Sequence, residues 1–415
     1  MTTGKRHTSL PENPQVITDV ETLRSFCARA AEAPYVAVDT EFMRESTFWS
    51  ILCLVQVAIG GEIRDGEEER MLSAVIDPLV EGGLDLSPLY ALFANEKVLK
   101  VFHAARQDLE IFHHEGGALP RSVFDSQVAA MVCGYGDSIG FENLLQRLTG
   151  ASVDKGARFT DWSIRPLSER QIKYALADVV YLCPAYEKLQ GQLEKRDRAG
   201  WIEEEMRGLL DESIYDVDPM ITYRRIKSRN AKPRTLAILR ELAAWRELEA
   251  RRRNMPRNRV LKDETLLEIA HDAPDSVSSL SRTRGLGQRL ADGHQGQDIL
   301  KAVARGVAIP EKDCPKLDQK PDLPNGISSA TDLLKVMLKM KCNDYDVAPK
   351  IIASSDDIEL IAAFGEKADV PALRSWRFDV FGRDALRLRN GECAFALKGR
   401  KLLLVDVPDD RTQST

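Results

Sequence analysis

The chain has 415 residues, of which 43% are hydrophobic and 29% are charged, and its formal net charge is −6. This composition predicts a globular protein of two or three domains. The chain has no long apolar run, and residues 1–14 have no signal-peptide pattern, so we expect neither a membrane-spanning nor a secreted protein. The seven cysteines stand singly without C-x-x-C spacing, so we expect no zinc or redox motif and a reduced, cytoplasmic location.

Residues 15–218 alternate strand-like and helix-like patterns and predict the first domain. The expected strands span 35–42, 51–59, 71–77 and 97–102, and the expected helices span 107–113, 126–134, 141–149 and 168–193. Three strands with short connections, followed by a strand and helix alternation, indicate a mixed α/β sheet with helices on its faces. We expect residues 60–70 to form an exposed hairpin loop and Asp125 to cap a helix.

Acidic side chains stand at the ends of these elements. Asp39 and Glu41 end the first expected strand, and the two-residue period of a strand projects both carboxylates from one face. Asp108 begins the helix after the fourth strand, and Tyr174 and Asp178 share one face of the long helix. Strand ends and helix starts meet at one edge of an α/β sheet, so we expect these side chains to converge there.

Carboxylates at the end of a buried strand repel each other and resist desolvation unless a cation holds them together. A cluster made only of carboxylates selects hard, oxygen-seeking ions, which favours Mg²⁺ or Mn²⁺ over zinc. Two such ions about 4 Å apart form a clamp for phosphodiester cleavage, in which one activates water and the other stabilises the leaving oxygen. The acids therefore predict metal-dependent cleavage of phosphodiester bonds.

A basic helical unit is expected at residues 225–310, with helices at 233–253, 263–271 and 297–305. Residues 221–310 contain 19 Lys and Arg against 10 Asp and Glu, which leaves the remainder of the chain at −15. A basic unit joined to an acidic one is typical of a protein in which one part holds a polyanion. The alternative is a solvated helical surface that is rich in arginine.

A linker and a third unit complete the chain. Prolines between 310 and 324 predict a linker at 311–326. Residues 327–407 open with an amphipathic helix and close with two apolar runs around Gly399 that predict a hairpin. Residues 1–14 are polar and are expected to be disordered.

Four segments together resemble the ribonuclease D family, which belongs to the DEDD exonucleases of the tyrosine subclass. They are Val38-Asp39-Thr40-Glu41-Phe42, His103-Ala104-x-x-x-Asp108-Leu109-Glu110, Thr160-Asp161-Trp162-x-x-Arg165-Pro166-Leu167-Ser168-x-Arg170-Gln171 and Tyr174-x-x-x-Asp178. The resemblance covers about residues 30–200 and implies a ribonuclease H-like fold. It implies that four acids bind two divalent ions, Mg²⁺ or Mn²⁺, and that Tyr174 positions the attacking water. These acids are Asp39, Glu41, Asp108 and Asp178.

The stretch 236–255 and the segment that begins at Arg259 are similar to the HRDC domain, a helical module shared by RecQ-type helicases and ribonuclease D. Residues 327–407 resemble a diverged second copy. The expected fold class is thus an α/β ribonuclease H-like exonuclease domain followed by one or two small all-α HRDC-like domains. Candidates for RNA binding in the basic unit are Arg251, Arg252, Arg253, Arg257 and Arg259. The alternative is a solvated helix end, where cations suit the helix dipole.

Five residues near the acids are candidates for substrate contact, and each has a structural alternative. His103 either touches the substrate or is a hydrogen-bonded residue at a strand end. Phe48 and Trp49 either stack on the terminal base or pack a loop, in a segment where the family often has a proline. Gln56 is either a contact or a core residue satisfied by the backbone, and Arg165 either binds phosphate or shapes its loop.

The sequence therefore predicts a metal-dependent 3′–5′ exoribonuclease that releases nucleoside 5′-monophosphates. The resemblance implies that its partners are tRNA precursors and other structured RNAs with single-stranded 3′ ends. Two alternatives remain open. One is a DNA exonuclease of the proofreading kind, because the same four acids act on a phosphodiester with or without a 2′-hydroxyl. The other is a non-catalytic nucleic-acid-binding protein, which the complete set of acids disfavours.

Overall fold

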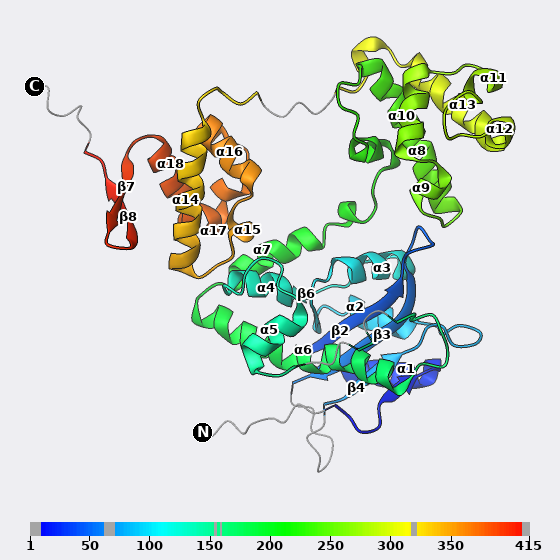
Figure 1. The fold of residues 1–415 in the computed structure, drawn as a ribbon. Coiled ribbons are helices and arrows are strands. Elements are labelled where there is room, and N and C mark those ends of the chain that lie inside the picture. Colours follow the sequence, from blue (N-terminus) through cyan, green and yellow to red (C-terminus); the bar gives the residue numbers. More distant parts are fainter. Residues whose placement is uncertain (1–9, 62–70, 153–155, 158–159, 317–321, 409–415) are drawn as a thin grey trace, which may run out of the picture.

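The computed structural model describes residues 10–61, 71–152, 156–157, 160–316 and 322–408. They form one α/β domain and two helical units that lie on the same side of it (Figure 1). The expected order of an α/β domain followed by helical units is confirmed. The expected loop at 60–70 and the expected disordered end at 1–14 lie mostly outside the described residues.

A six-stranded sheet forms the centre of the α/β domain, in the order β1-β4-β3-β2-β5-β6. The strands are β1 (Gln15–Ile17), β2 (Tyr35–Met43), β3 (Ile51–Gly60), β4 (Ser73–Ile76), β5 (Leu99–Phe102) and β6 (Val123–Asp125). β3 runs antiparallel to β2 and β4, whereas the other neighbouring pairs are parallel. Because β2, β5 and β6 are parallel, their carboxyl ends lie at one edge of the sheet, where sites form in α/β folds.

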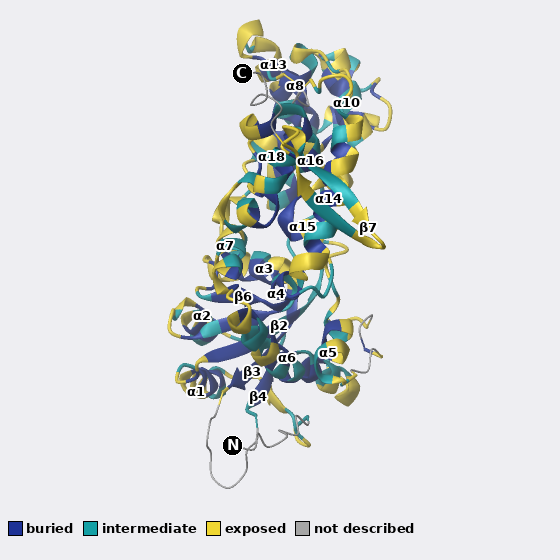
Figure 2. Ribbon diagram, turned by 90° about the vertical axis from the view of Figure 1, so that its left-hand side faces the viewer, coloured by how far each residue is buried: buried dark blue, intermediate teal, exposed yellow. Residues whose placement is uncertain are grey.

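Helices cover both faces of this sheet (Figures 1 and 2). One face carries α1 (Val20–Ala30), α2 (Ser87–Ala94) and α3 (Arg106–Gly116), and the other carries α4 (Ser126–Val132), α5 (Phe141–Thr149) and α6 (Glu169–Lys195), with α7 (Ala199–Leu209) following. The Ser168 side chain accepts a hydrogen bond from the Gln171 backbone, and this capping box fixes the start of α6. α6 then contacts β2, β3, β4 and β5, so it runs across the sheet beneath the carboxyl edge.

The second unit is a helical domain with its own hydrophobic core. It comprises the 3-10 helix η2 (Pro219–Arg225) and the helices α8 (Pro233–Arg252), α9 (Arg257–Val260), α10 (Asp263–Asp272), α11 (Val277–Leu280), α12 (Gln288–Asp292) and α13 (His294–Ala308). Buried leucines of α8, such as Leu239 and Leu242, pack against Leu266 and Ile299. The apolar spacing of α8 predicted this arrangement, and the helix begins at the expected Pro233.

The third unit docks on α7 of the α/β domain. Its helices are α14 (Ser328–Tyr345), α15 (Pro349–Ile352), α16 (Ser355–Phe364), α17 (Ser375–Arg377) and α18 (Arg383–Arg389). Trp201 of α7 stacks on Trp376 with ring centroids 4.0 Å apart, and the buried Arg377 pairs with Glu204 at 2.8 Å. The expected hairpin is confirmed as β7 (Cys393–Lys398) and β8 (Lys401–Asp406), so this unit is not purely helical.

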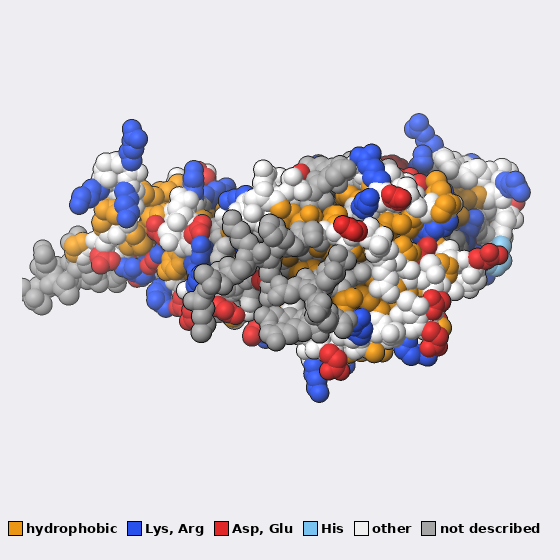
Figure 3. Space-filling view, turned by 90° about the horizontal axis from the view of Figure 1, so that it is seen from below, with side chains coloured by type: hydrophobic (Ala, Val, Ile, Leu, Met, Phe, Trp, Pro, Cys, Tyr) orange, Lys and Arg blue, Asp and Glu red, His pale blue; other side chains and the backbone are white. Residues whose placement is uncertain are grey.

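None of the described helices combines the length and apolar character needed to cross a bilayer. On the face seen from below, basic and acidic side chains alternate around exposed hydrophobic groups (Figure 3). Among the side chains that this view draws in colour, neither the basic nor the acidic ones gather into a single patch.

Candidate active site

Asp39, Asp108 and Asp178 come from three elements that meet at the carboxyl edge of the sheet. β2 carries Asp39, the first turn of α3 carries Asp108, and α6 carries Asp178. Asp108 is 6% exposed, and the other two are half-buried. Burial, and then the Asp178 carboxylate, raise the pKa of Asp39 well above its usual range. Burial, and then the Asp39 carboxylate, do the same to the pKa of Asp108, so Asp178 destabilises the charge on Asp39, and Asp39 destabilises the charge on Asp108.

Glu41 lies at a β-bulge beside this cluster. It faces Leu54 across the β2–β3 ladder while Phe42 faces Leu52, so the register shifts between the two residues. A bulge redirects the side chains next to it and is frequent beside active sites. Burial chiefly raises the pKa of the Cys53 thiol to about 11, and the Glu41 carboxylate contributes to that rise, which places Glu41 near Cys53.

The turn before α3 is held by Asp125. Its carboxylate caps α4 by accepting from Gln127 N at 2.8 Å, which confirms the expected helix cap. It also accepts from Ala104 N and Ala105 N, both at 2.9 Å. Ala104 has a φ of 61°, a left-handed conformation that is strained for alanine. Asp125 therefore stabilises the strained turn that presents Asp108.

Thr40 contacts a candidate ligand, and the sequence analysis did not single it out. It is 6% exposed, and its hydroxyl Oγ1 donates a hydrogen bond to Asp108 Oδ1. Its neighbours in β2, Asp39 and Glu41, project from the other face, as the two-residue period requires. The signal was available in the sequence as a hydroxyl between two candidate ligands.

Tyr174 lies one turn before Asp178 on α6, as the spacing predicted. Its ring centroid is 6.1 Å from that of the buried Trp162. The two rings belong to a small apolar cluster under β3 and β4. Tyr174 and Asp178, four residues apart, lie on the same side of α6.

The donor set at this edge fits a hard divalent ion, because every candidate ligand is a carboxylate oxygen. The raised pKa values of Asp39 and Asp108 show that negative charge on these two carboxylates is unfavourable here, and a bound cation would relieve it. Within the described part of the chain, no three Asp, Glu, His or Cys side chains are placed to hold one metal ion together.

Gln56 lies on β3 directly opposite Asp39. Residues opposite each other on an antiparallel pair project from the same face, so the amide lies next to the Asp39 carboxylate. Gln56 is fully buried, and neither its amide oxygen nor its amide nitrogen has a hydrogen-bond partner among the described residues. The expectation that the backbone satisfies this side chain is wrong, and an orphaned amide beside the carboxylates is a reason to link Gln56 to the site.

His103 and Arg165 are both engaged with other protein groups. His103 Nδ1 lies 2.9 Å from Ser126 Oγ and its Nε2 lies 3.1 Å from the Ile139 carbonyl oxygen. Arg165 donates to both Asp77 carboxylate oxygens, at 2.7 and 2.6 Å, and to the carbonyls of Cys53, Trp162 and Ile164. These contacts favour the structural alternatives for both residues, and a contact with substrate stays a prediction.

Phe48 and Trp49 lie in the seam between the α/β domain and the second unit. Phe48 is 8% exposed and packs against Ala250 and Val260. The Trp49 ring already stacks on His114, with centroids 3.9 Å apart and planes 11° apart. Stacking of either ring on a terminal base would require these contacts to open, so the packed-loop alternative agrees better with the structure.

The arginines of the second unit are divided between ion pairs and solvent. Arg251 and Arg257 both bind the buried Glu247, with Arg257 Nη2 at 2.7 Å from its carboxylate. Arg252 and Arg253 pair with Glu249. Arg259 is exposed. Two of the five candidates for RNA binding are thus engaged with Glu247 inside the helical unit.

Comparisons with known proteins agree with this architecture. A family model described as 3′–5′ exonuclease matches residues 14–194, and an HRDC domain model matches residues 235–303. A ribonuclease D of Jannaschia sp. (strain CCS1) is 50% identical over 394 residues, which cover 95% of this chain and 100% of that protein. A ribonuclease D of Granulibacter bethesdensis is 45% identical and covers 95% of this chain and 97% of that protein. The crystal structure of Escherichia coli RNase D, an exoribonuclease involved in structured RNA processing, matches with a TM-score of 0.76 at 31% identity and covers 92% of this chain and 99% of that chain.

Proposed function

Because the chain belongs to the ribonuclease D family and is a 3′–5′ exoribonuclease, we propose that it hydrolyses RNA at the edge of the sheet that carries Asp39, Asp108 and Asp178. The observation that carries this assignment is a buried corner of like charges, where burial and the Asp178 carboxylate raise the pKa of Asp39, and burial and the Asp39 carboxylate raise the pKa of Asp108. Buried like charges that perturb one another are typical of functional sites.

The family is dependent on divalent metal ions, and we propose two, Mg²⁺ or Mn²⁺, at Asp39, Glu41, Asp108 and Asp178. Bound there, the ions would supply an activated water and neutralise charge on the leaving 3′ oxygen. The Thr40 hydroxyl donates a hydrogen bond that holds the Asp108 carboxylate, and Glu41 lies at the bulge beside the site. The Tyr174 hydroxyl orients the attacking water, since the tyrosine stands one turn from Asp178.

RNA is the substrate class of this family, and we propose tRNA precursors and other structured RNAs with single-stranded 3′ ends as the natural substrates. The Escherichia coli enzyme is an exoribonuclease involved in structured RNA processing, which supports this choice. The products are nucleoside 5′-monophosphates. The proposal includes a cytoplasmic location, which is in keeping with seven buried cysteines that are all unpaired.

The test compares end-labelled RNA and DNA oligonucleotides of one sequence, with and without Mg²⁺ or Mn²⁺. We expect RNA to shorten from its 3′ end, and we expect excess EDTA to stop the reaction. Faster cleavage of the DNA would favour the proofreading alternative. If neither oligonucleotide were cleaved, the result would favour the non-catalytic alternative. Undiminished turnover in EDTA would refute the metal-dependent site.

Variants localise the reaction. Asp39→Asn and Asp108→Asn should each lower the rate by at least about 100-fold, since loss of a mere supporting residue around a metal already costs 10- to 100-fold. Asp85→Asn is the matched control, because Asp85 is an exposed acid that accepts from Ser87 N at 2.9 Å, which asparagine can also do. Equal activity of all three variants would place the chemistry elsewhere.

A further inference from the structure

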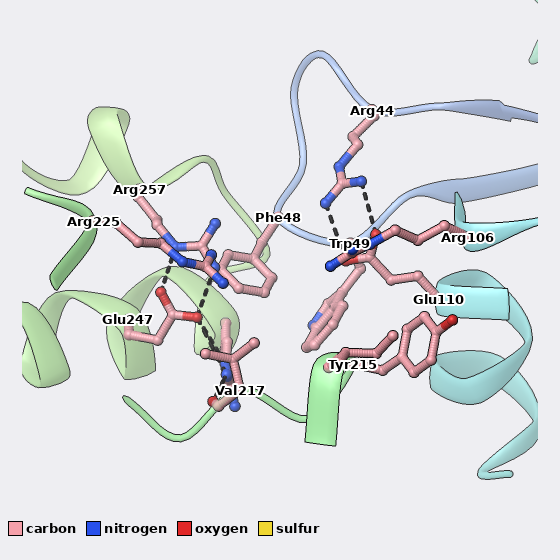
Figure 4. Close-up of a pocket in the computed structure, with 12 residues that line it drawn as sticks. Arg44, Phe48, Trp49, Arg106, Glu110, Tyr215, Val217, Arg225, Glu247 and Arg257 are labelled. Atoms are coloured by element: carbon pink, nitrogen blue, oxygen red, sulfur yellow. Dashed lines mark hydrogen bonds and ion pairs between the residues drawn. The ribbon is translucent and has the colours of Figure 1, made fainter. Parts of the chain in front are cut away.

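A pocket lies in the seam between the α/β domain and the second unit (Figure 4). Its volume is about 200 Å³, and its walls come from the β2–β3 loop, α3, the connector around Tyr215, η2, α8 and α9. Phe48 and Trp49 lie between the two walls, with the side chains of the helical unit on one side and those of α3 on the other (Figure 4). The pocket therefore exists only while the two parts are docked.

Positive charge dominates the lining. Five arginines, Arg44, Arg106, Arg225, Arg251 and Arg257, face two carboxylates. Glu110 is taken by Arg44 at 2.9 and 3.1 Å, and Glu247 is shared by Arg251 and Arg257. One further acid, Asp216, lies outside the lining, 3.8 Å from Arg251 and largely exposed. The five arginines of the lining outnumber the three acids that lie in the lining or pair with one of these arginines.

Arg106 and Arg225 are the two cations that this network leaves available. Neither forms an ion pair with any carboxylate of the described residues, and both are exposed. Arg106 starts α3 and Arg225 ends η2, and the two lie on opposite sides of the pocket (Figure 4). Two unpaired guanidinium groups that face a shared cavity are suited to an oxyanion such as phosphate, which each can bind through two N–H groups.

The pocket is close to the proposed active site along the chain. Arg44 follows Glu41 by three residues, and Arg106 precedes Asp108 by two. Three residues span at most about 11 Å, so Cα atoms on the pocket wall lie within that distance of two of the proposed metal ligands. A strand of RNA whose 3′ end occupies the active site would pass this seam within a few nucleotides.

We propose that the seam pocket binds the phosphodiester backbone of the RNA a few nucleotides upstream of the scissile bond, with Arg106 and Arg225 as the phosphate ligands. This inference rests on the proposed exoribonuclease function and adds a subsite to it. Arg44, Arg251 and Arg257 position the walls through their ion pairs and contribute field rather than direct contact. Because one ligand comes from each domain, RNA binding here favours the docked arrangement of the two.

The experiment measures RNA affinity with the full chain in EDTA, where the substrate should remain intact. The probe is a fluorescein-labelled 12-nucleotide single-stranded RNA, and its anisotropy is followed at several salt concentrations. Arg225→Gln removes the charge on one wall, and the double variant Arg106→Gln/Arg225→Gln removes both. Arg282→Gln is the matched control, an exposed arginine of the same unit outside the pocket lining.

We expect Arg225→Gln to weaken binding about 10-fold, the effect of one charge-assisted hydrogen bond. The slope of log affinity against log salt should fall by about 0.7 for each lost phosphate contact, and so by about 1.4 in the double variant. Arg282→Gln should change the affinity less than about 2-fold.

Equal affinities and salt slopes for Arg225→Gln and Arg282→Gln would overturn the pocket assignment. The proposed function would still stand if the wild type binds RNA in EDTA and shortens it when Mg²⁺ or Mn²⁺ is present. Failure of the wild type itself to bind or shorten RNA would instead refute that function. A second arm titrates AMP into each protein. If Arg225→Gln lost AMP binding but kept its RNA affinity, the pocket would take free nucleotide and the RNA assignment would be wrong.

Discussion

Replacement of Thr40 by valine tests whether the hydroxyl that donates to Asp108 supports metal binding. Valine has the same shape and the same β-branch, so the buried strand β2 and its packing should survive. The variant leaves Asp108, a carboxylate that is 6% exposed, without its side-chain donor. A hydrogen bond to a charged group contributes about 1.5–3 kcal/mol, which corresponds to roughly 10- to 150-fold in an equilibrium.

We therefore expect Thr40→Val to raise the Mg²⁺ or Mn²⁺ concentration for half-maximal rate by about 10- to 100-fold, the range usual for a residue that supports a metal ligand. The rate at saturating metal should change less. The assay follows release of nucleotide from end-labelled RNA across a metal titration, and circular dichroism checks the fold. Thr40→Ser keeps the hydroxyl and should restore wild-type metal dependence. The same half-saturation for Thr40→Val as for wild type would refute the reasoning.

Three further variants probe the same domain. Gln56→Leu removes a buried amide without a hydrogen-bond partner, so the free energy of unfolding of the metal-free protein in urea should rise by about 1–2 kcal/mol. Activity should fall if the amide serves Asp39. A lower free energy of unfolding would show that the amide is satisfied. Tyr174→Phe should lower the rate at saturating metal by roughly 10- to 1000-fold and leave the metal concentration for half-maximal rate unchanged. This pattern is the reverse of that expected for Thr40→Val. A shift in the metal requirement would make the tyrosine a ligand rather than a water-orienting group. Burial lowers the pKa of Lys100 from 10.5 to about 8, so the unfolded chain binds more protons across that window and the lysine contributes more stability as pH rises through it. Wild type should therefore gain about 2 kcal/mol over Lys100→Met between pH 7.5 and 10 in urea unfolding, and parallel stability curves would contradict the shift.

The elements that the sequence predicted well are those with a strong local signal. The long helix α6 begins after Ser168, as its capping box requires, and α5 spans the expected Phe141–Thr149. The missed strands β1 and β6 have three residues each, too short for a period of two to stand out. The missed helix α2 is apolar on nearly every side, so it lacks the one-sided spacing that identifies a helix.

Asp39, Glu41 and Asp108 could be placed at one edge from their positions at or just after strand ends, because parallel topology brings strand ends together. The roles of Phe48 and Arg251 could not, since they depend on contacts between segments far apart in the chain. Asn254, with a φ of 46°, accepts hydrogen bonds from Phe48 N at 3.1 Å and Trp49 N at 3.0 Å across more than 200 residues. Such a contact has no local pattern, whereas the four acids and the tyrosine carry theirs within each segment.

The β2–β3 loop links the helical unit to the acids across the seam. Glu41 ends the regular part of β2, and the same loop continues through Arg44 to Phe48, which the helical unit holds by its ring and its backbone. Deletion of residues 221–415 would remove RNA affinity from a region with a balance of +9, but it would also expose Phe48 and release this loop. A loss of activity in the truncated chain would therefore not separate RNA binding from support of the site. Arg225 lies on the pocket wall, at the end of η2. Its substitution removes one positive charge and leaves the β2–β3 loop anchored, so it isolates the electrostatic contribution to RNA binding.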